Sequence, residues 1–130
     1  MAQVLVTQGA EGLIVSNTTV ARPATLKSPH RGEQGGLSGA PLFAPSTALL
    51  ARFRQKLPDL PMIGVGGIDS VDRAYEKFRA GADAIQFYSG LVRRGPGFAR
   101  ELRRGLAARL AAEGISHLRD VVGTGLPSAD

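Results

Sequence analysis

Four short segments of this chain place hydroxyl, amide or glycine residues where an apolar run gives way to a loop. The first segment, residues 16–19 (Ser-Asn-Thr-Thr), follows the apolar run at residues 12–15. The side-chain amide of Asn17 both donates and accepts hydrogen bonds, which suits a planar heterocycle with ring N–H and carbonyl groups. An asparagine at the start of a loop also caps it by bonding to its own backbone. Residue type alone leaves both interpretations of Asn17 open.

Two further segments combine glycine with the ends of apolar runs. Gly66 and Gly67 stand between such a run and an expected helix start near Ser70, where a free backbone and a helix dipole favour a bound phosphate. Ser89 and Gly90 have the same relation to the next run. In (β/α)8 barrels the loops after strands seven and eight commonly form a phosphate site. Tight turns that bind nothing are the alternative for both glycine pairs.

The remaining segment lies in a stretch rich in proline and glycine at residues 21–45. Loops this long inside compact domains are usually lids, binding loops or disordered. Within it, Ser38 and Gly39 are predicted to hydrogen-bond a ligand, and an ordinary turn is the alternative.

Composition narrows the classes of function. The chain has 130 residues, of which 43% are hydrophobic, enough for one modest core. It has no cysteine, so disulfides and thiolate chemistry are excluded, and His30 and His117 are too far apart for a recognisable metal motif. We therefore expect no metal. A net charge of +5 favours anionic partners, but the arginines of residues 100–104 lack the interleaved aromatic residues of a nucleic-acid platform.

Strand and helix patterns alternate along the chain. Nearly continuous apolar runs at residues 12–15, 62–65 and 84–88 predict parallel strands. Amphipathic or capped segments predict helices at residues 46–57, 70–80 and 98–113. In the first of these helices Leu49, Leu50, Phe53 and Leu57 form the apolar stripe, and Arg54 is expected on its polar side. Residues 2–9 resemble the end of a helix, and residues 116–122 predict one more short helix. The pattern indicates an α/β fold with a parallel sheet.

The chain is expected to be soluble and cytoplasmic. No apolar stretch approaches the roughly 18 residues that span a bilayer, and the start lacks the features of a signal peptide. Three strands would leave exposed sheet edges, which favour self-association, whereas a complete barrel takes about 250 residues. The sequence therefore predicts roughly half of a barrel.

The four segments resemble, in order and spacing, the C-terminal third of the quinone-dependent (class 2) dihydroorotate dehydrogenases. The segments that carry this resemblance are residues 12–19, 35–42, 63–68 and 86–90, and the similarity extends over residues 2–114. It implies the C-terminal part of a (β/α)8 TIM barrel, with about three βα units. A partial FMN-binding domain would cover residues 1–122, followed by a flexible tail at residues 123–130.

The resemblance also implies a function. Members of this family oxidise (S)-dihydroorotate to orotate through FMN in pyrimidine biosynthesis and pass the electrons to a membrane quinone. By position, Asn17 and Thr18 would bind the orotate ring, and Ser16 would lie beside the flavin. The other cofactor-binding residues implied are Ser38, Gly39, Gly66 and Gly67, with the backbone of Tyr88 and Ser89.

Several parts of the family pattern have no counterpart in the chain. The family's serine base, the lysine beside the flavin and the N-terminal helices that reach the membrane are among them. The resemblance thus implies a complete enzyme bound peripherally at the cytoplasmic face of the membrane, and a chain that by itself does not oxidise dihydroorotate. A non-catalytic phosphate- or flavin-binding half-barrel that self-associates is the alternative function.

Overall fold

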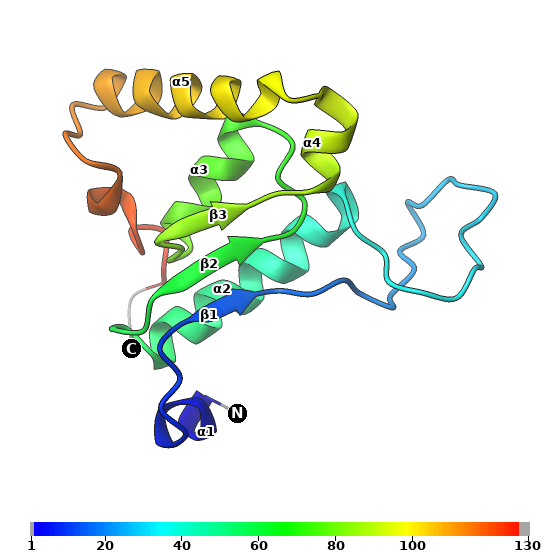
Figure 1. Cartoon of the computed structure of the whole chain (residues 1–130), viewed down its shortest axis with the longest axis horizontal. Coiled ribbons are helices and arrows are strands. Elements are labelled where there is room, and N and C mark those ends of the chain that lie inside the picture. The colour runs from blue at the N-terminus through cyan, green and yellow to red at the C-terminus, as the bar shows by residue number, and fades with distance from the viewer. Residues whose placement is uncertain (1, 128–130) are drawn as a thin grey trace.

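A three-stranded parallel sheet is the framework of the molecule (Figure 1). The computed structural model describes residues 2–127. Its strands are β1 (Leu13–Val15), β2 (Met62–Val65) and β3 (Ala84–Gln86), in the order β1-β2-β3. Ile14 lies opposite Ile63 on one side of β2, and Ile63 lies opposite Ala84 on the other. Because all three strands are parallel, their carboxyl ends meet at one edge of the sheet, and the predicted α/β fold is confirmed.

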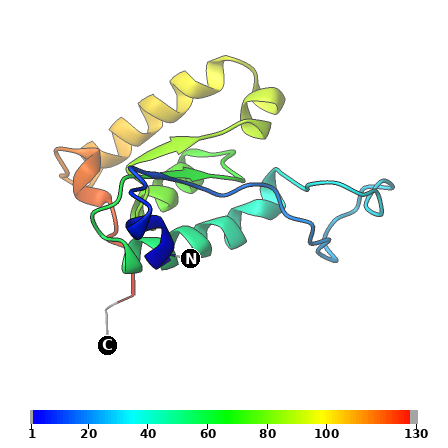
Figure 2. The same ribbon diagram turned by 60° about the horizontal axis from the view of Figure 1, so that its bottom comes forward.

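Helices connect the strands and pack along the sheet. The helices are α1 (Ala2–Thr7), α2 (Phe43–Lys56), α3 (Val71–Arg79), α4 (Ser89–Arg94) and α5 (Gly97–Ala112), with 3-10 turns η1 (Ala40–Leu42) and η2 (Leu118–Val121). Helix α2 contacts β1 and β2, whereas α3 contacts β3 and α5. The long loop between β1 and η1 projects away from this body in Figures 1 and 2. No helix within residues 2–127 has the length and apolar composition needed to cross a bilayer.

Two apolar clusters hold the helices in place. The first joins the sheet to α2 and includes Val15, Leu50 and Met62. The second joins α3 to α5 and includes Phe78, Phe98, Leu102 and Leu106. The opposite face of the sheet carries Ile14, which is 60% exposed. Within the described residues the helices therefore cover one face of the sheet much better than the other.

Helix α2 differs from the prediction at its start and in its buried face. It begins at Phe43, not at residue 46, and Pro45 lies in its first turn, where the missing N–H of proline costs nothing. Leu49, predicted to be buried, is 40% exposed, whereas Arg54, predicted on the polar side, is only 8% exposed.

The segment after β3 also differs from the prediction. The strand ends at Gln86 and not at residue 88, because Phe87 turns to pack edge-to-face on Phe98 with ring centroids 5.2 Å apart. Ser89 and Gly90, expected in a loop, begin helix α4. A side chain at position 90 would place Cβ 2.4 Å from the Ile68 carbonyl oxygen, so close packing against the preceding loop requires glycine here.

Other predicted boundaries are confirmed within a few residues. The Ser70 hydroxyl caps α3 by accepting from the Arg73 N–H, and Gly81 follows the helix with φ 107°. A flexible tail is predicted at residues 123–130. Of these, Gly123 and Gly125 donate backbone hydrogen bonds to the carbonyl groups of Phe78 and Arg79, and residues 128–130 lie outside the described residues. The division of the chain at residue 122 stays a prediction.

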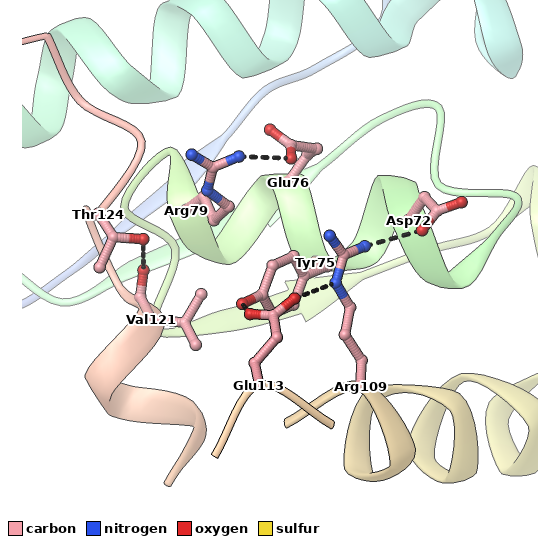
Figure 3. Close-up of polar contacts among 8 residues, drawn as sticks. All are labelled: Asp72, Tyr75, Glu76, Arg79, Arg109, Glu113, Val121 and Thr124. Atoms are coloured by element: carbon pink, nitrogen blue, oxygen red, sulfur yellow. Dashed lines mark hydrogen bonds and ion pairs between the residues drawn. The ribbon is translucent and has the colours of Figure 1, made fainter. Parts of the chain in front are cut away.

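A polar cluster joins α5 to α3 (Figure 3). The Arg109 guanidinium lies 3.8 Å from the ring centroid of Tyr75 and pairs with Asp72 at 2.8 Å and with Glu113 at 2.9 Å. The Tyr75 hydroxyl donates to Glu113. This hydrogen bond, followed by that of Arg109, holds the pKa of Glu113 below its usual range. The charged form of Glu113 is therefore favoured where the two helices meet.

Arg54 ties α2 to the turn before β3. Its guanidinium donates to the Gly81 carbonyl at 2.9 Å, to the Pro58 carbonyl at 2.5 Å and to the Asp83 carboxylate at 2.5 Å. The same Asp83 oxygen accepts from the Met62 N–H at 2.7 Å, at the first residue of β2. One buried arginine thus connects α2 with the starts of two strands.

Replacing Arg54 is expected to destabilise the fold. In Arg54→Met the Gly81 and Pro58 carbonyl oxygens lose this donor and the Asp83 carboxylate loses its charged partner, which lowers the free energy of unfolding by about 1–3 kcal/mol. Urea unfolding followed by circular dichroism measures this change. Arg52→Met is the matched control, because Arg52 lies exposed on the same helix. An equal effect of both substitutions would contradict a special role for Arg54.

Candidate functional site

A cleft of about 340 Å³ opens at the carboxyl ends of the three strands. Its volume lies within the range of roughly 300–1,000 Å³ that is typical of small-molecule sites. All nine residues singled out from the sequence line it: Ser16, Asn17, Thr18, Ser38, Gly39, Gly66, Gly67, Tyr88 and Ser89. Parallel strands bring these segments together, although they are spread over most of the chain.

The segment after β1 shows how Asn17 is used in the free protein. Its Oδ1 accepts a hydrogen bond from the Thr18 N–H at 2.7 Å, and the Ser16 hydroxyl donates to the Asn17 carbonyl at 3.1 Å. The side-chain oxygen of Asn17 therefore caps the local backbone, as one of the two interpretations predicted. Its amide nitrogen has no partner among residues 2–127 and remains available in the cleft.

Direct contacts join the other segments. An added Cβ at Gly36 would lie 1.9 Å from Oγ1 of Thr18, so the two limbs of the long loop approach closely only because position 36 is glycine. Ser89 donates a hydrogen bond from its hydroxyl to that of Ser38 at 3.3 Å. The substrate-side and phosphate-side segments predicted from the sequence therefore form one continuous lining.

Gly66 and Gly67 adopt positive φ angles of 105° and 72°. A Cβ at Gly67 would lie 2.5 Å from the Phe43 backbone nitrogen, and one at Gly66 would lie 2.9 Å from the Leu42 side chain. Packing within the chain therefore requires glycine at both positions. This agrees with the alternative in which the two glycines only form a tight turn. The N–H groups of Gly67 and Ile68 have no acceptor among residues 2–127, so the turn also presents free donors.

The helix start that lines the cleft differs from the one expected. Ser70 caps α3, and neither Ser70 nor Val71 lines the cleft. Ser89 and Gly90, the first residues of α4, do line it. N–H groups in the first turn of a helix lack acceptors within that helix, and no side chain caps α4. The helix N–H donors in the cleft therefore come from the start of α4 and not from α3, and they add to those of the glycine turn.

The balance of charge in the cleft favours an anion. The Asp69 carboxylate lines the cleft but is paired with Arg73 at 2.9 Å. Arg93 also lines the cleft, and it makes no ion pair within the described part of the chain. Residues 2–127 contain no group of three or more side chains of the kind that bind metal ions. Backbone donors with an adjacent guanidinium suit a phosphate or carboxylate group.

Lys77 is a buried support of the glycine turn that the sequence analysis missed. Its ammonium group, with the side chain 0% exposed, donates to Oγ of Ser46 at 2.7 Å and to the Val65 carbonyl at 3.2 Å. Ser46 in turn lies 3.4 Å from the Gly66 carbonyl oxygen. Burial lowers the pKa of Lys77 to about 8. The available signal was its position between Ala74 and Phe78 on the apolar side of α3.

Comparisons with known proteins point to one family. A sequence model of the family described as dihydroorotate dehydrogenase matches residues 1–110. A dihydroorotate dehydrogenase (quinone) of Parvibaculum lavamentivorans is 52% identical over 124 residues, which cover 95% of this chain and 36% of the relative. Another, from Brucella melitensis, is 50% identical over 115 residues, covering 88% and 32%.

Solved structures give the same result. Ligand-free DHODH from Eimeria tenella has a TM-score of 0.90 at 39% identity, covering 95% of this chain and 34% of that one. DHODH of the same organism in complex with ferulenol also has a TM-score of 0.90 at 39% identity, covering 94% and 32%. The chain spans about a third of the length of these relatives. Its three βα units correspond to part of a (β/α)8 barrel, as predicted.

The buried position of Lys77 is expected to produce a pH dependence of stability. Its pKa is about 8 in the folded chain, against 10.5 for a lysine side chain in water, the value expected once the chain unfolds. Between these values the unfolded chain binds more protons, so the free energy of unfolding rises with pH. Urea unfolding at several pH values from about 8 to 9.5 measures this rise in the free energy of unfolding. The rise should be absent in Lys77→Met. It should remain in Lys56→Met, where the lysine replaced is exposed. Parallel curves for wild type and Lys77→Met would contradict this.

Proposed function

The chain belongs to the dihydroorotate dehydrogenase family, and we propose that its cleft binds the phosphate end of FMN and one side of the orotate ring. The observation that carries this proposal is the convergence of all nine predicted residues on one cleft. Parallel strands account for the meeting of the segments, and the hydrogen-bonding groups that these nine residues bring to one cleft are what support ligand binding there. The oxidation of (S)-dihydroorotate to orotate in pyrimidine biosynthesis is the reaction to which these two sites contribute.

The donor groups of the cleft fit a phosphate ester. We assign the phosphate to the backbone N–H groups of Gly66, Gly67, Tyr88 and Ser89. Fixed N–H groups at a turn and a helix start bind phosphate without a bulky side chain between them. Arg93 adds positive charge beside them, and the pairing of Asp69 with Arg73 removes the nearest uncompensated negative charge. The assignment to FMN rests on this donor set and on family membership.

The opposite side of the cleft fits the substrate and the ribityl chain. Asn17 and Thr18 supply an amide and a hydroxyl for the ring N–H and carbonyl groups of orotate. Ser16 is assigned to the flavin, and Ser38 and Gly39 to the path between flavin and phosphate. These side chains lie at the end of β1 and in the long loop, so their positions depend on how that loop is held.

This chain is proposed to bind and orient the reactants. FMN, when bound, supplies the acceptor for the hydride that leaves dihydroorotate. No residue of the cleft is assigned as the base that removes the accompanying proton, a step for which a positioned base is required. Transfer of electrons to a quinone at the cytoplasmic face of the membrane is proposed for the complete enzyme, on the basis of its relatives' names and the family resemblance.

Asn17→Asp is expected to weaken orotate binding without disturbing the local turn. The aspartate retains an oxygen for the Thr18 N–H but loses the amide donors and adds a negative charge facing an anionic ligand. Orotate affinity, measured by calorimetry in the presence of FMN, should fall by roughly 1–3 kcal/mol. Gln8→Glu makes the same change at an exposed position before β1 that does not line the cleft, and it should have no effect. Unchanged affinity in Asn17→Asp would remove Asn17 from the site.

Gly67→Val is expected to abolish the contribution of phosphate to flavin binding. The valine side chain would meet the Phe43 backbone and displace the turn that carries the N–H donors. Wild type should bind FMN more tightly than riboflavin by fluorescence titration, and the variant should bind both alike. Gly95→Ala is the control, because Gly95 has φ 78° but an added Cβ meets nothing within 4 Å.

Arg103→Ala and Arg104→Ala test whether helix charge, rather than turn geometry, holds the phosphate. Both arginines are exposed on α5 and do not line the cleft. Each variant should retain the preference for FMN over riboflavin. Equal losses in these variants and in Gly67→Val would show that charge on α5 accounts for binding.

A further inference from the structure

We propose that Arg22 is a positioning residue that orders the long loop between β1 and η1 and thereby fixes Thr18 and Ser38 on opposite sides of the cleft. Arg22 belongs to this loop but does not line the cleft. Its role would therefore be exerted through the residues at the two ends of the loop. The claim that Arg22 orders the loop rests on the structure of the free chain. The claim that this order affects ligand binding rests on the proposed function.

The contacts of the Arg22 side chain are unusual for a surface arginine. All of its acceptors are backbone carbonyl oxygens of the loop itself. Nε donates to Arg31 at 3.1 Å, Nη2 donates to Glu33 and Gly35 at 2.8 Å each, and Nη1 donates to Val20 at 3.1 Å, with longer contacts to Thr19 and Ala21. No carboxylate within residues 2–127 forms an ion pair with it. The guanidinium thus holds carbonyl groups from both limbs of the loop around one point.

The chemistry of this contact requires arginine. A guanidinium presents five N–H donors in a rigid plane, so it reaches carbonyl groups on several sides at once. A lysine ammonium has the same charge but only three donors at one point, on a more flexible stem. Lysine at position 22 would retain the positive charge but could not make most of these hydrogen bonds. Arg22→Lys therefore separates the effect of the charge from the effect of the hydrogen bonds.

The ends of the loop carry the residues assigned to ligands. Thr19 and Leu37 pair across the base of the loop, with N–H to carbonyl distances of 3.0 Å and 2.7 Å. Thr18 precedes one member of this pair and Ser38 follows the other. Ser38 also contacts Ser89 at the start of α4. An ordered loop therefore sets the distance between the substrate side and the phosphate side of the cleft.

Hydrogen exchange of the full chain without ligands tests the effect on loop order. In Arg22→Lys the amide protons of Thr19 and Leu37 should exchange at least about tenfold faster, while that of Ile63 in β2 stays protected. Arg31→Lys is the matched control, since the Arg31 side chain makes no hydrogen bond within residues 2–127. Unchanged protection of Thr19 and Leu37 in Arg22→Lys would overturn the proposal.

Orotate titration tests the effect on the cleft. The apparent affinity falls in proportion to the fraction of molecules with an ordered loop. Arg22→Lys is expected to lower this fraction to about one tenth, so it should bind orotate about tenfold more weakly, whereas Arg31→Lys should bind it normally. A disordered loop with normal orotate affinity would overturn the positioning role. If wild type binds no orotate, the proposed function fails, whereas the exchange experiment still reports on Arg22.

A measurement on the wild-type chain covers the case in which Arg22→Lys does not fold. In ¹⁵N spectra the Nε–H proton of Arg22 should exchange with water more slowly than that of Arg31, because only the former is hydrogen-bonded. Equal and fast exchange of both Nε–H protons would overturn the proposal without any variant.

Discussion

Helix α2 and its preceding turn lie so close to β2 and the loop after it that Gly64, Gly66 and Gly67 have little or no room for a side chain. A Cβ at Gly64 would approach Ala82 at 3.0 Å and Leu50 at 3.2 Å, and one at Gly67 would approach the Phe43 backbone at 2.5 Å. This contact sets where the chain leaves the sheet and which way its N–H groups face. The donors of the cleft are thus a product of core packing, and they are in place before any ligand arrives.

Much of this arrangement could be predicted from the sequence, because it depends on short-range patterns. Continuous apolar runs identified three parallel strands, and parallel strands necessarily bring their carboxyl ends to one edge. Polar and glycine residues just after those runs were therefore predicted to meet. Helix α4 was not predicted, since Ser89 and Gly90 resemble a turn and become helical where Phe87 packs on Phe98.

The polar side chains that support the site were harder to predict. Arg54, Lys77 and Arg22 all bond to backbone carbonyl groups, and every residue type carries the same carbonyl. These carbonyl partners therefore leave no trace in the sequence. Charged residues on a helix are usually solvated, and only the folded chain shows that two of these are buried.

The hydroxyl contact between Ser38 and Ser89 links the two sides of the cleft. With a phosphate bound as proposed, restraint of the start of α4 would extend to Ser38 and, through the Thr19–Leu37 pair, to the segment with Thr18. Thermodynamic linkage is reciprocal. If bound cofactor raises the affinity for substrate by some factor, bound substrate raises the affinity for cofactor by the same factor. With both ligands seated as assigned, the affinity of the chain for the flavin would then depend on whether substrate is bound.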